Sequence, residues 1–220
     1  MTAKPLLKIC GLRSPEQAAA VAALGVDAIG VIGVRQSPRW LAPDQRPALW
    51  QAMASASSRC FGVLVVADPS DQDLAELRSG GHQVVQLHGQ ESPDRCRELR
   101  QQLAKPIWKA LRIRSAADLE LAHTYGAVAD ALLLDAWVEG VLGGTGQAIP
   151  QALLADFAPP GPWWLAGGLT PERLPQVLAG VRPTGCDVSS GVERAPGDKD
   201  LNQVAALVAA LNESGATPAA

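Results

Sequence analysis

The sequence has no basic stripe, no interleaved aromatic residues and no long apolar run. Aromatic residues make up 4% of the chain, and its lysines and arginines are scattered along a sequence of formal net charge -3. Nucleic-acid binding depends on clustered positive charge, so we expect no nucleic-acid partner. No apolar run approaches the ~20 residues of a membrane helix, and the first residues lack the apolar core of a signal peptide. We therefore expect a cytoplasmic protein without a membrane partner.

Metal-binding and disulfide patterns are also missing. The four cysteines, Cys10, Cys60, Cys96 and Cys186, are widely spread and form no C-x-x-C pair. This spacing favours reduced thiols over a disulfide framework or a zinc site. No second histidine stands at metal-ligand spacing, so we predict no metal. Hydrophobic residues make up 47% of the chain, which is enough to build a sizeable core.

Short apolar runs alternate with helical segments along the whole chain, and no linker rich in Pro, Gly or Ser divides it. Strands are predicted at Leu6–Cys10, Ala28–Val34, Phe61–Val66, Val84–Leu87, Ile107–Ala110, Ala131–Leu134, Trp163–Ala166 and Cys186–Val188. Eight strand–helix units in 220 residues fit a single-domain (β/α)8 TIM barrel better than an open doubly wound sheet. We predict the barrel over residues 1–212 and a frayed tail over 213–220.

The first predicted helix has a recognisable start. Ser14 is a typical N-cap residue, and Pro15 suits the first helical position. Gln17 stands where the side chain of a capping box returns to the backbone of the N-cap residue. The sequence therefore predicts a capping box between Ser14 and Gln17.

Chemistry in such a barrel lies at the C-terminal ends of the strands. Side chains at i and i+2 share a face of a strand, which predicts inward-pointing pairs. These pairs are Lys8 with Cys10, Gln86 with His88, Leu133 with Asp135, and Asp187 with Ser189. Asp135 stands where a charge is costly to bury, because it ends an apolar run that reads as a strand buried on both faces. It must find donors, stay protonated or meet a ligand, and capping of the following loop is the competing explanation.

Glycine-rich loops follow three of the later strands. Gly167-Gly168 and Ser189-Ser190-Gly191 predict backbone N–H groups for a phosphate, although plain turns use the same residues. The Gly143-Gly144-Thr145-Gly146 loop predicts closure over a ligand.

Three further side chains have both a functional and an ordinary interpretation. Cys10 is either a small buried hydrophobe or a thiol that Lys8 shifts toward the thiolate, below the free-cysteine pKa of about 8.5. His88 is either a base or ligand, or a hydrogen-bonded structural group. Arg39 either pairs bidentately with a carboxylate or is a solvated surface residue.

Six motifs stand in order along the chain: Lys8–Leu12, Ser37–Arg39, Val85–Gly89, Leu134-Asp135 with Gly143–Gly146, Leu165–Leu169 and Asp187–Glu193. Together they resemble the phosphoribosylanthranilate isomerase family of tryptophan biosynthesis. The resemblance implies an Amadori rearrangement of N-(5-phosphoribosyl)anthranilate to 1-(2-carboxyphenylamino)-1-deoxyribulose 5-phosphate, without a cofactor, by a monomer or homodimer. It makes Cys10 the general base and Asp135 the general acid. The expected substrate-binding residues are Lys8, Arg39, Gln86, His88, Gly144, Gly167, Gly168, Asp187, Ser189, Ser190 and Gly191.

The sequence departs from the family pattern at three places. Gln147–Pro150 follows the glycine loop in place of the usual aromatic segment, Val31–Val34 lacks the usual phenylalanines, and Arg13 replaces a threonine. Two other classes compete with the isomerase. One is a different phosphosugar barrel enzyme, such as the next tryptophan-pathway synthase or a histidine-pathway isomerase. The other is a non-catalytic phosphosugar-binding barrel, against which the presence of both Cys10 and Asp135 argues.

Overall fold

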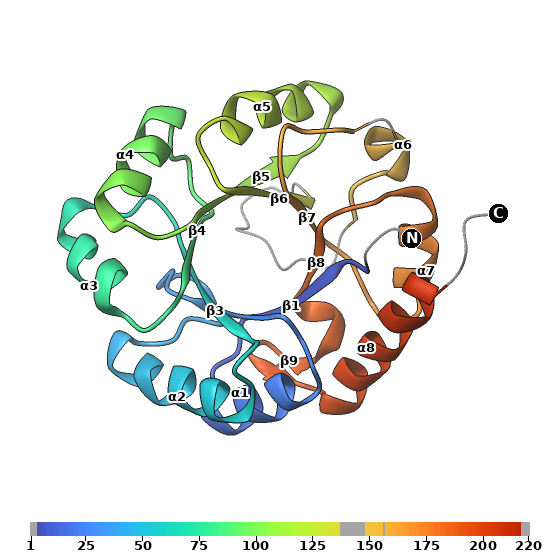
Figure 1. Ribbon diagram of the computed structural model, residues 1–220, viewed down its shortest axis with the longest axis horizontal. Helices are drawn as coiled ribbons and strands as arrows, with labels where there is room; N and C mark the ends of the chain where they lie inside the picture. The colour runs from blue at the N-terminus through green and yellow to red at the C-terminus, as the bar shows by residue number, and fades with distance from the viewer. Residues whose placement is uncertain (1–3, 137–147, 156, 217–220) are drawn as a thin grey trace.

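Eight parallel strands close into a barrel in the computed structural model, which describes residues 4–136, 148–155 and 157–216 (Figure 1). The strands are β1 Leu6–Cys10, β2 Ala28–Ile32, β3 Phe61–Val66, β4 Val84–Leu87, β5 Ile107–Ile113, β6 Ala131–Ala136, β7 Trp163–Ala166 and β8 Gly185–Val188. Each strand pairs with its sequence neighbours, and β8 pairs with β1. The predicted TIM barrel is confirmed.

Helices surround this barrel, and 3-10 turns lead into some of them (Figure 1). The helices are α1 Pro15–Ala23, α2 Arg46–Ala56, α3 Leu74–Ser79, α4 Pro93–Leu103, α5 Ala116–Gly126, α6 Gln151–Leu154, α7 Leu174–Gly180 and α8 Leu201–Ala216; the 3-10 turns are η1 Pro43–Gln45, η2 Asp71–Asp73 and η3 Ser190–Val192. Helix α8 thus includes part of the predicted tail, and residues 217–220 lie outside the described residues. No helix in the described ranges is long and apolar enough to cross a membrane.

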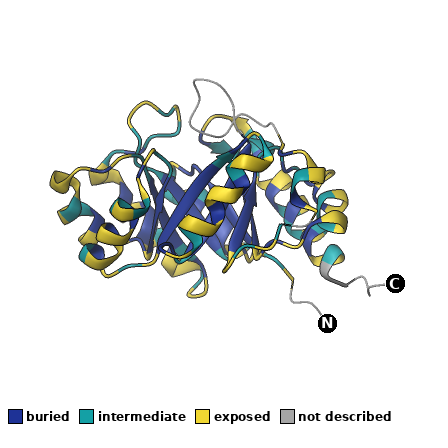
Figure 2. Cartoon of the chain, turned by 90° about the horizontal axis from the view of Figure 1, so that it is seen from above, coloured by how far each residue is buried: buried dark blue, intermediate teal, exposed yellow. Residues whose placement is uncertain are grey.

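Two hydrophobic layers hold the barrel together. One lies between the strands and the helices, and Figure 2 shows the buried strands at the centre with exposed residues on the outer helices. The other fills the barrel with residues that point inward, including Trp108 and Trp164, whose ring centroids are 4.6 Å apart. Gly185 makes room for these rings, because a Cβ there would lie 2.5 Å from the Trp164 ring. The interior is therefore packed, and only the strand ends are free for chemistry.

The predicted strand ends need three corrections. Strand β2 stops at Ile32, because the chain turns at Val34, whose carbonyl accepts a hydrogen bond from the N–H of Ser37. Strand β5 continues to Ile113, and its register places Arg112 opposite Asp135. Strand β6 continues to Ala136, so Asp135 lies inside the strand.

A short hairpin near the C-terminal end of β8 is absent from the sequence prediction. It consists of β9 Glu193–Ala195 and β10 Asp198–Lys199, which pair antiparallel. Gln17 of α1 holds this hairpin: its Oε1 accepts from the N–H of Lys199 at 3.0 Å, and its Nε2 donates to Asp198 Oδ1 at 2.6 Å. The predicted capping box is therefore wrong in one half, since Ser14 caps the helix through the N–H of Gln17 while the Gln17 side chain points to the hairpin.

Acid should destabilise the fold through His82, which is 3% exposed in the segment before β4. Burial and then the charge of Lys105 lower the pKa of His82 to about 4. The unfolded chain binds this proton near pH 6.5, whereas the folded chain resists it down to about pH 4. Stability from the neutral ring is thus complete above pH 6.5 and is lost as the pH falls toward 4, by roughly 3 kcal/mol in total.

We predict that His82→Gln loses less unfolding free energy than the parent between pH 7 and pH 4.5 in urea titrations. His123→Gln, at an exposed position of α5, is the matched control and should follow the parent. An equal loss in the His82→Gln variant would show that His82 has no part in the acid sensitivity.

Candidate active site

A buried ion pair joins β1 to β8 near the C-terminal ends of the strands. Lys8 Nζ donates to Asp187 Oδ1 at 2.9 Å, and the two residues lie opposite each other in the strand register. Burial opposes the charge on Lys8, but Asp187 and Cys10 outweigh it, and the pKa of Lys8 is raised. Lys8 is therefore a fixed cation next to Cys10.

The Cys10 thiol lies above this pair in a space that Gly30 leaves open. A Cβ on Gly30 would lie 2.6 Å from Cys10 Sγ and 3.0 Å from Lys8 Cε. Burial raises the pKa of Cys10, whereas Lys8 and Lys199 lower it. Lys8 thus acts on Cys10 in the predicted direction, but burial outweighs both ammonium groups and the net pKa of Cys10 is raised. Cys10 is a thiol at neutral pH.

Asp135 lies at the end of β6 and is 6% exposed. Its Oδ1 accepts a hydrogen bond from the adjacent N–H of Ala136 at 2.9 Å. Burial and then the Asp187 carboxylate raise the pKa of Asp135 to about 7, while Ala136, Lys8 and Arg112 act in the opposite direction. Near neutral pH this carboxyl group can therefore both hold and release a proton, which is the property of a general acid.

His88, at the end of β4, lies next to Asp135, and Gln86 lies next to His88. Gln86 Nε2 is 3.3 Å from His88 Nδ1, and His88 Nε2 is 3.7 Å from Asp135 Oδ2. Burial and then the charge of Lys109 lower the pKa of His88 to about 3, so the ring is neutral and its approach to Asp135 is not an ion pair. Gln86 Oε1 and His88 Nε2 are buried without a hydrogen-bond partner among the described residues.

The loops after β7 and β8 touch each other. Gly167 and Gly168 have φ angles of 91° and 60°, in the region that favours glycine. A Cβ on Gly191 would overlap the carbonyl oxygen of Leu169, so this close approach also requires glycine. Within the described ranges, the N–H group of Gly168 has no backbone acceptor. This N–H group is available to an anion, and Ser190 and Gly191 begin the short η3 turn after β8.

Arg39 is not a solvated surface residue. Its side chain is 11% exposed, and its Nη2 donates to Glu193 Oε2 at 2.7 Å, while its Nε lies 3.0 and 3.1 Å from the two oxygens. It rests on Gly11, where a Cβ would lie 2.6 Å from Arg39 Cδ. The predicted bidentate pairing is thus present, but with a carboxylate of the protein itself.

The structure brings Lys8, Cys10, Gln86, His88, Asp135 and Asp187 together at one end of the barrel. Ser189 adds a hydrogen bond from its Oγ to the carbonyl of Cys10 at 3.0 Å. Gly144 and the Gly143–Gly146 loop lie outside the described residues. Arg13, which departs from the family pattern, packs on Gly197 of the hairpin turn and reaches the carbonyl of Pro38.

The sequence alone predicted no role for Glu193 or Lys199, and it did not place Arg112 on a strand. Glu193 stood at the end of the Asp187–Glu193 motif, but only its place in the motif was noted. Arg112 lay beyond the predicted end of its strand, and Lys199 belongs to a two-residue strand that shows no period. The i, i+2 rule could have found Arg112, because Trp108, Ala110 and Arg112 alternate along β5.

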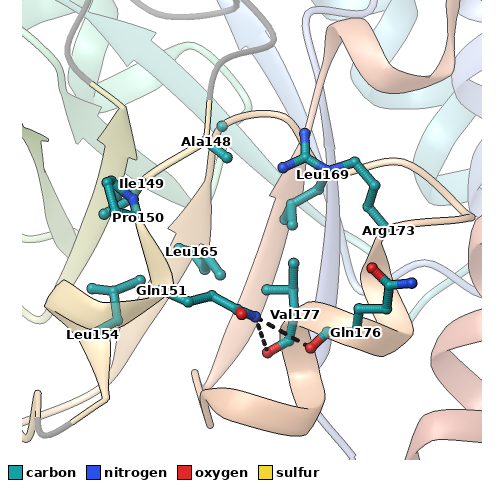
Figure 3. A pocket seen from close by; sticks show the side chains of 11 residues that line it. Ala148, Ile149, Pro150, Gln151, Leu154, Leu165, Leu169, Arg173, Gln176 and Val177 are labelled. Atoms are coloured by element: carbon teal, nitrogen blue, oxygen red, sulfur yellow. Dashed lines mark hydrogen bonds between the residues drawn. The ribbon is translucent and has the colours of Figure 1, made fainter.

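A separate pocket of about 290 Å³ lies between α6 and α7 (Figure 3). Its lining includes Leu154, Leu165 and Arg173, and Gln151 Nε2 closes one side by donating to the carbonyls of Gln176 and Val177 at 3.2 and 3.3 Å. Gly167 and Leu169, of the loop after β7, also line it. The ionisable cluster of Cys10 and Asp135 does not line it, so the chemistry lies elsewhere.

Comparisons with known proteins agree with this geometry. The family model described as N-(5'-phosphoribosyl)anthranilate (PRA) isomerase matches residues 7–210. An N-(5'-phosphoribosyl)anthranilate isomerase from Synechococcus elongatus is 47% identical over 206 residues, which cover 93% of this chain and 95% of the relative.

Two solved structures extend the similarity to three dimensions. Monomers generated from the dimeric phosphoribosylanthranilate isomerase of Thermotoga maritima are 26% identical, with a TM-score of 0.82 and coverage of 95% of this chain and 99% of that one. A phosphoribosylanthranilate isomerase in complex with reduced 1-(o-carboxyphenylamino)-1-deoxyribulose 5-phosphate is 26% identical, with a TM-score of 0.78 and the same coverage. The chain therefore belongs to the N-(5'-phosphoribosyl)anthranilate isomerase family.

Proposed function

We propose that the chain catalyses the Amadori rearrangement of N-(5'-phosphoribosyl)anthranilate in tryptophan biosynthesis. Family membership supports the reaction, and a solved relative binds a reduced form of the product. The observation that carries the mechanism is the buried carboxyl group of Asp135, whose pKa lies at about 7. The reaction needs one proton delivered and another removed, and Asp135 and Cys10 lie on strands that β7 and β8 separate.

Asp135 acts first, as the general acid. It gives its proton to the ring oxygen of the ribosylamine, the C1–O bond breaks, and the nitrogen lone pair forms an iminium ion with C1. The positive iminium makes the C2–H acidic. The Cys10 thiolate removes that proton, which leaves an enolamine that tautomerises to the ketone. Acid and base groups in such positions each contribute about 10²–10⁴-fold to the rate.

The order of the two pKa values affects the pH profile. The pKa of Cys10 lies above its ordinary value, and the pKa of Asp135 is about 7. The reaction needs Asp135 protonated and Cys10 ionised at the same time. Because the acid loses its proton at a lower pH than the thiol does, this reactive form is only a minor fraction of the enzyme. The rate still follows a bell-shaped profile, because that minor form is most abundant between the two macroscopic pKa values. The Cys10 thiolate in this form is a strong base, because the pKa of Cys10 is high.

The remaining polar groups suit the other parts of the substrate. We assign the phosphate to the backbone N–H groups of Gly168, Ser190 and Gly191, in the contacting loops after β7 and β8. The anthranilate carboxylate would meet the outer edge of Arg39, whose inner edge is taken by Glu193. Gln86 Oε1 and His88 Nε2 offer hydrogen bonds to sugar hydroxyls, which would satisfy two buried atoms that have no protein partner in the described part of the chain.

The Lys8–Asp187 pair completes this assignment. Both side chains are buried, and Lys8 is close enough to Cys10 to favour its ionised form. Asp187 raises the pKa values of both Cys10 and Asp135, so it keeps the base strong and the acid protonated.

Turnover by the purified chain tests the proposed function itself. The purified chain should consume N-(5'-phosphoribosyl)anthranilate, followed by the loss of its fluorescence, and Asp135→Asn should lower kcat by about 10²–10⁴-fold with little change in KM. The Asn variant should also turn the bell-shaped profile into a single rising limb. Binding of the substrate without turnover by the parent chain would favour a phosphosugar-binding protein over an isomerase.

The same substitution should stabilise the fold. The pKa of Asp135 is about 7 in the folded chain, against an ordinary value of 3.8. The folded carboxyl group therefore holds its proton longer, and stability falls as the pH rises from 3.8 through 7, by roughly 4 kcal/mol. Asp135→Asn should gain stability over the parent at pH 8 but hardly at pH 4, measured by urea unfolding. Asp44→Asn, at an exposed position, should show no such pH-dependent gain.

Cys10→Ser tests the base. The serine hydroxyl is nearly isosteric but does not ionise near neutral pH, so kcat should fall by about 10²-fold or more while the unfolding midpoint stays close to that of the parent. Cys186→Ser is the matched control for loss of a buried thiol on a neighbouring strand. Full activity in Cys10→Ser would reduce Cys10 to core packing. His88 would then be a poor substitute, because its pKa of about 3 makes it a weak base.

A further inference from the structure

The β9–β10 hairpin carries a buried carboxylate that two cations share. Glu193 has a 4% exposed side chain and accepts from Arg39 Nη2 at 2.7 Å and from Lys199 Nζ at 2.6 Å. The N–H of Gly197, in the hairpin turn, also donates to Glu193 Oε1 at 3.0 Å. Burial opposes the charge, but these partners outweigh it and lower the pKa of Glu193. The orientation of the Arg39 guanidinium is thus set from the hairpin.

Lys199 uses its whole ammonium group in the same place. Its side chain is fully buried, and its Nζ donates to the carbonyl of Cys10 at 2.5 Å, to the carbonyl of Ser189 at 3.3 Å and to Glu193. An ammonium group has three N–H donors, so none is left over. Lys199 therefore joins the end of β1, the loop after β8 and the carboxylate that holds Arg39.

The cluster has one more positive charge than negative, since Glu193 is the carboxylate paired with both Arg39 and Lys199. A buried excess of charge is costly unless an anion approaches it. Glu193 takes the Nε and one Nη2 hydrogen of Arg39, and the Nη1 group has no partner among the described residues. The excess charge is thus presented on the outer edge of Arg39.

We propose that Glu193 and Lys199 are positioning residues for this reaction, and that they act on different steps. Glu193 orients Arg39 toward the carboxylate of the substrate, while Lys199 fixes the main chain of Cys10 at the distance from which its sulfur reaches C2–H. The inference rests on the proposed function, because both roles are defined by the substrate of that reaction.

A purely structural role for the hairpin makes a different prediction. If Glu193 and Lys199 only stabilise the fold, their substitution lowers the unfolding midpoint, and loss of folded protein lowers the apparent kcat but leaves KM unchanged, so kcat is calculated per folded molecule. The exposed pair of Arg194 with Asp198 in the same hairpin supplies a matched control, because its side chains are 60% and 45% exposed. Arg194→Gln should leave both kinetic constants as in the parent.

The test is steady-state kinetics of the full chain, with unfolding midpoints measured for each variant. Glu193→Gln should raise KM by roughly tenfold and change kcat by less than about twofold, because Arg39 loses its charged partner. Lys199→Met should lower kcat by roughly tenfold at nearly unchanged KM, since the Glu193–Arg39 pair is kept. The effect of Arg39→Ala on KM should be smaller in the Glu193→Gln background than in the parent.

Two results would overturn the proposal: unchanged constants in folded Glu193→Gln and Lys199→Met, or a fall in apparent kcat that disappears when kcat is calculated per folded molecule, with KM unchanged in both. If Glu193→Gln does not fold, Glu193→Asp is used instead, because it keeps the charge but moves the carboxylate away from Arg39 by one methylene. An unchanged KM in Glu193→Asp would also overturn the proposal. Activity of the parent chain reports separately on the proposed function, since a parent that does not turn over N-(5'-phosphoribosyl)anthranilate removes that function before any variant is compared.

Discussion

The burial of charge at the C-terminal ends of the strands is the constraint on which the site depends. Lys8 and Asp187 are held 2.9 Å apart with almost no access to water. A pair of this kind contributes little net stability, because desolvation opposes the attraction, but it is costly to break. Its value lies in its effect on neighbours, since Lys8 lies beside Cys10 and Asp187 keeps protons on both Cys10 and Asp135.

The same low-dielectric environment treats the three kinds of titratable group differently. Burial favours the neutral form of each, so it raises the pKa of the Asp135 carboxyl group and of the Cys10 thiol and lowers that of the His88 ring. His88 is thereby excluded as a proton carrier near pH 7 and becomes a neutral neighbour of Asp135. Asp135 is brought to a pKa at which proton release and uptake are both easy.

The glycines explain how so many groups fit at one end of a barrel. Gly30 leaves the space that Cys10 and Lys8 occupy, and Gly11 lets Arg39 lie flat against the chain next to Cys10. Gly191 brings the loop after β8 against the loop after β7. Each is a position where an added Cβ would displace a group of the site, so these glycines shape the site as directly as its polar residues do.

Periodicity was enough to predict the barrel and the inward pairs, because a strand alternates its side chains whatever its partners are. The alternation placed Lys8 with Cys10 and Gln86 with His88 on the correct face. It did not show that Lys8 meets Asp187, since that contact depends on the register between the first and last strands. Whether burial or Lys8 dominates the pKa of Cys10 could not be predicted either, because this too depends on contacts between distant parts of the chain.

Other features left no local pattern to read. The hairpin strands are too short to show a period, so the roles of Glu193 and Lys199 became visible only through their long-range contacts with Arg39 and Cys10. Gln17 looked like a capping residue, and only the folded chain shows that its side chain binds the hairpin instead. In each case a contact with a distant part of the chain determines the partner of the side chain, and the neighbouring sequence does not show that contact.

The mechanism depends on a protonated Asp135 carboxyl group at the barrel mouth near neutral pH. The most direct test is the ¹³C titration of its carboxyl carbon by NMR in aspartate-labelled protein, with Asp135→Asn used to assign the signal. A midpoint near pH 7 is the predicted result, in line with the pKa of about 7 that burial and Asp187 give this group. A midpoint near pH 4, where an ordinary aspartate titrates, would contradict the account.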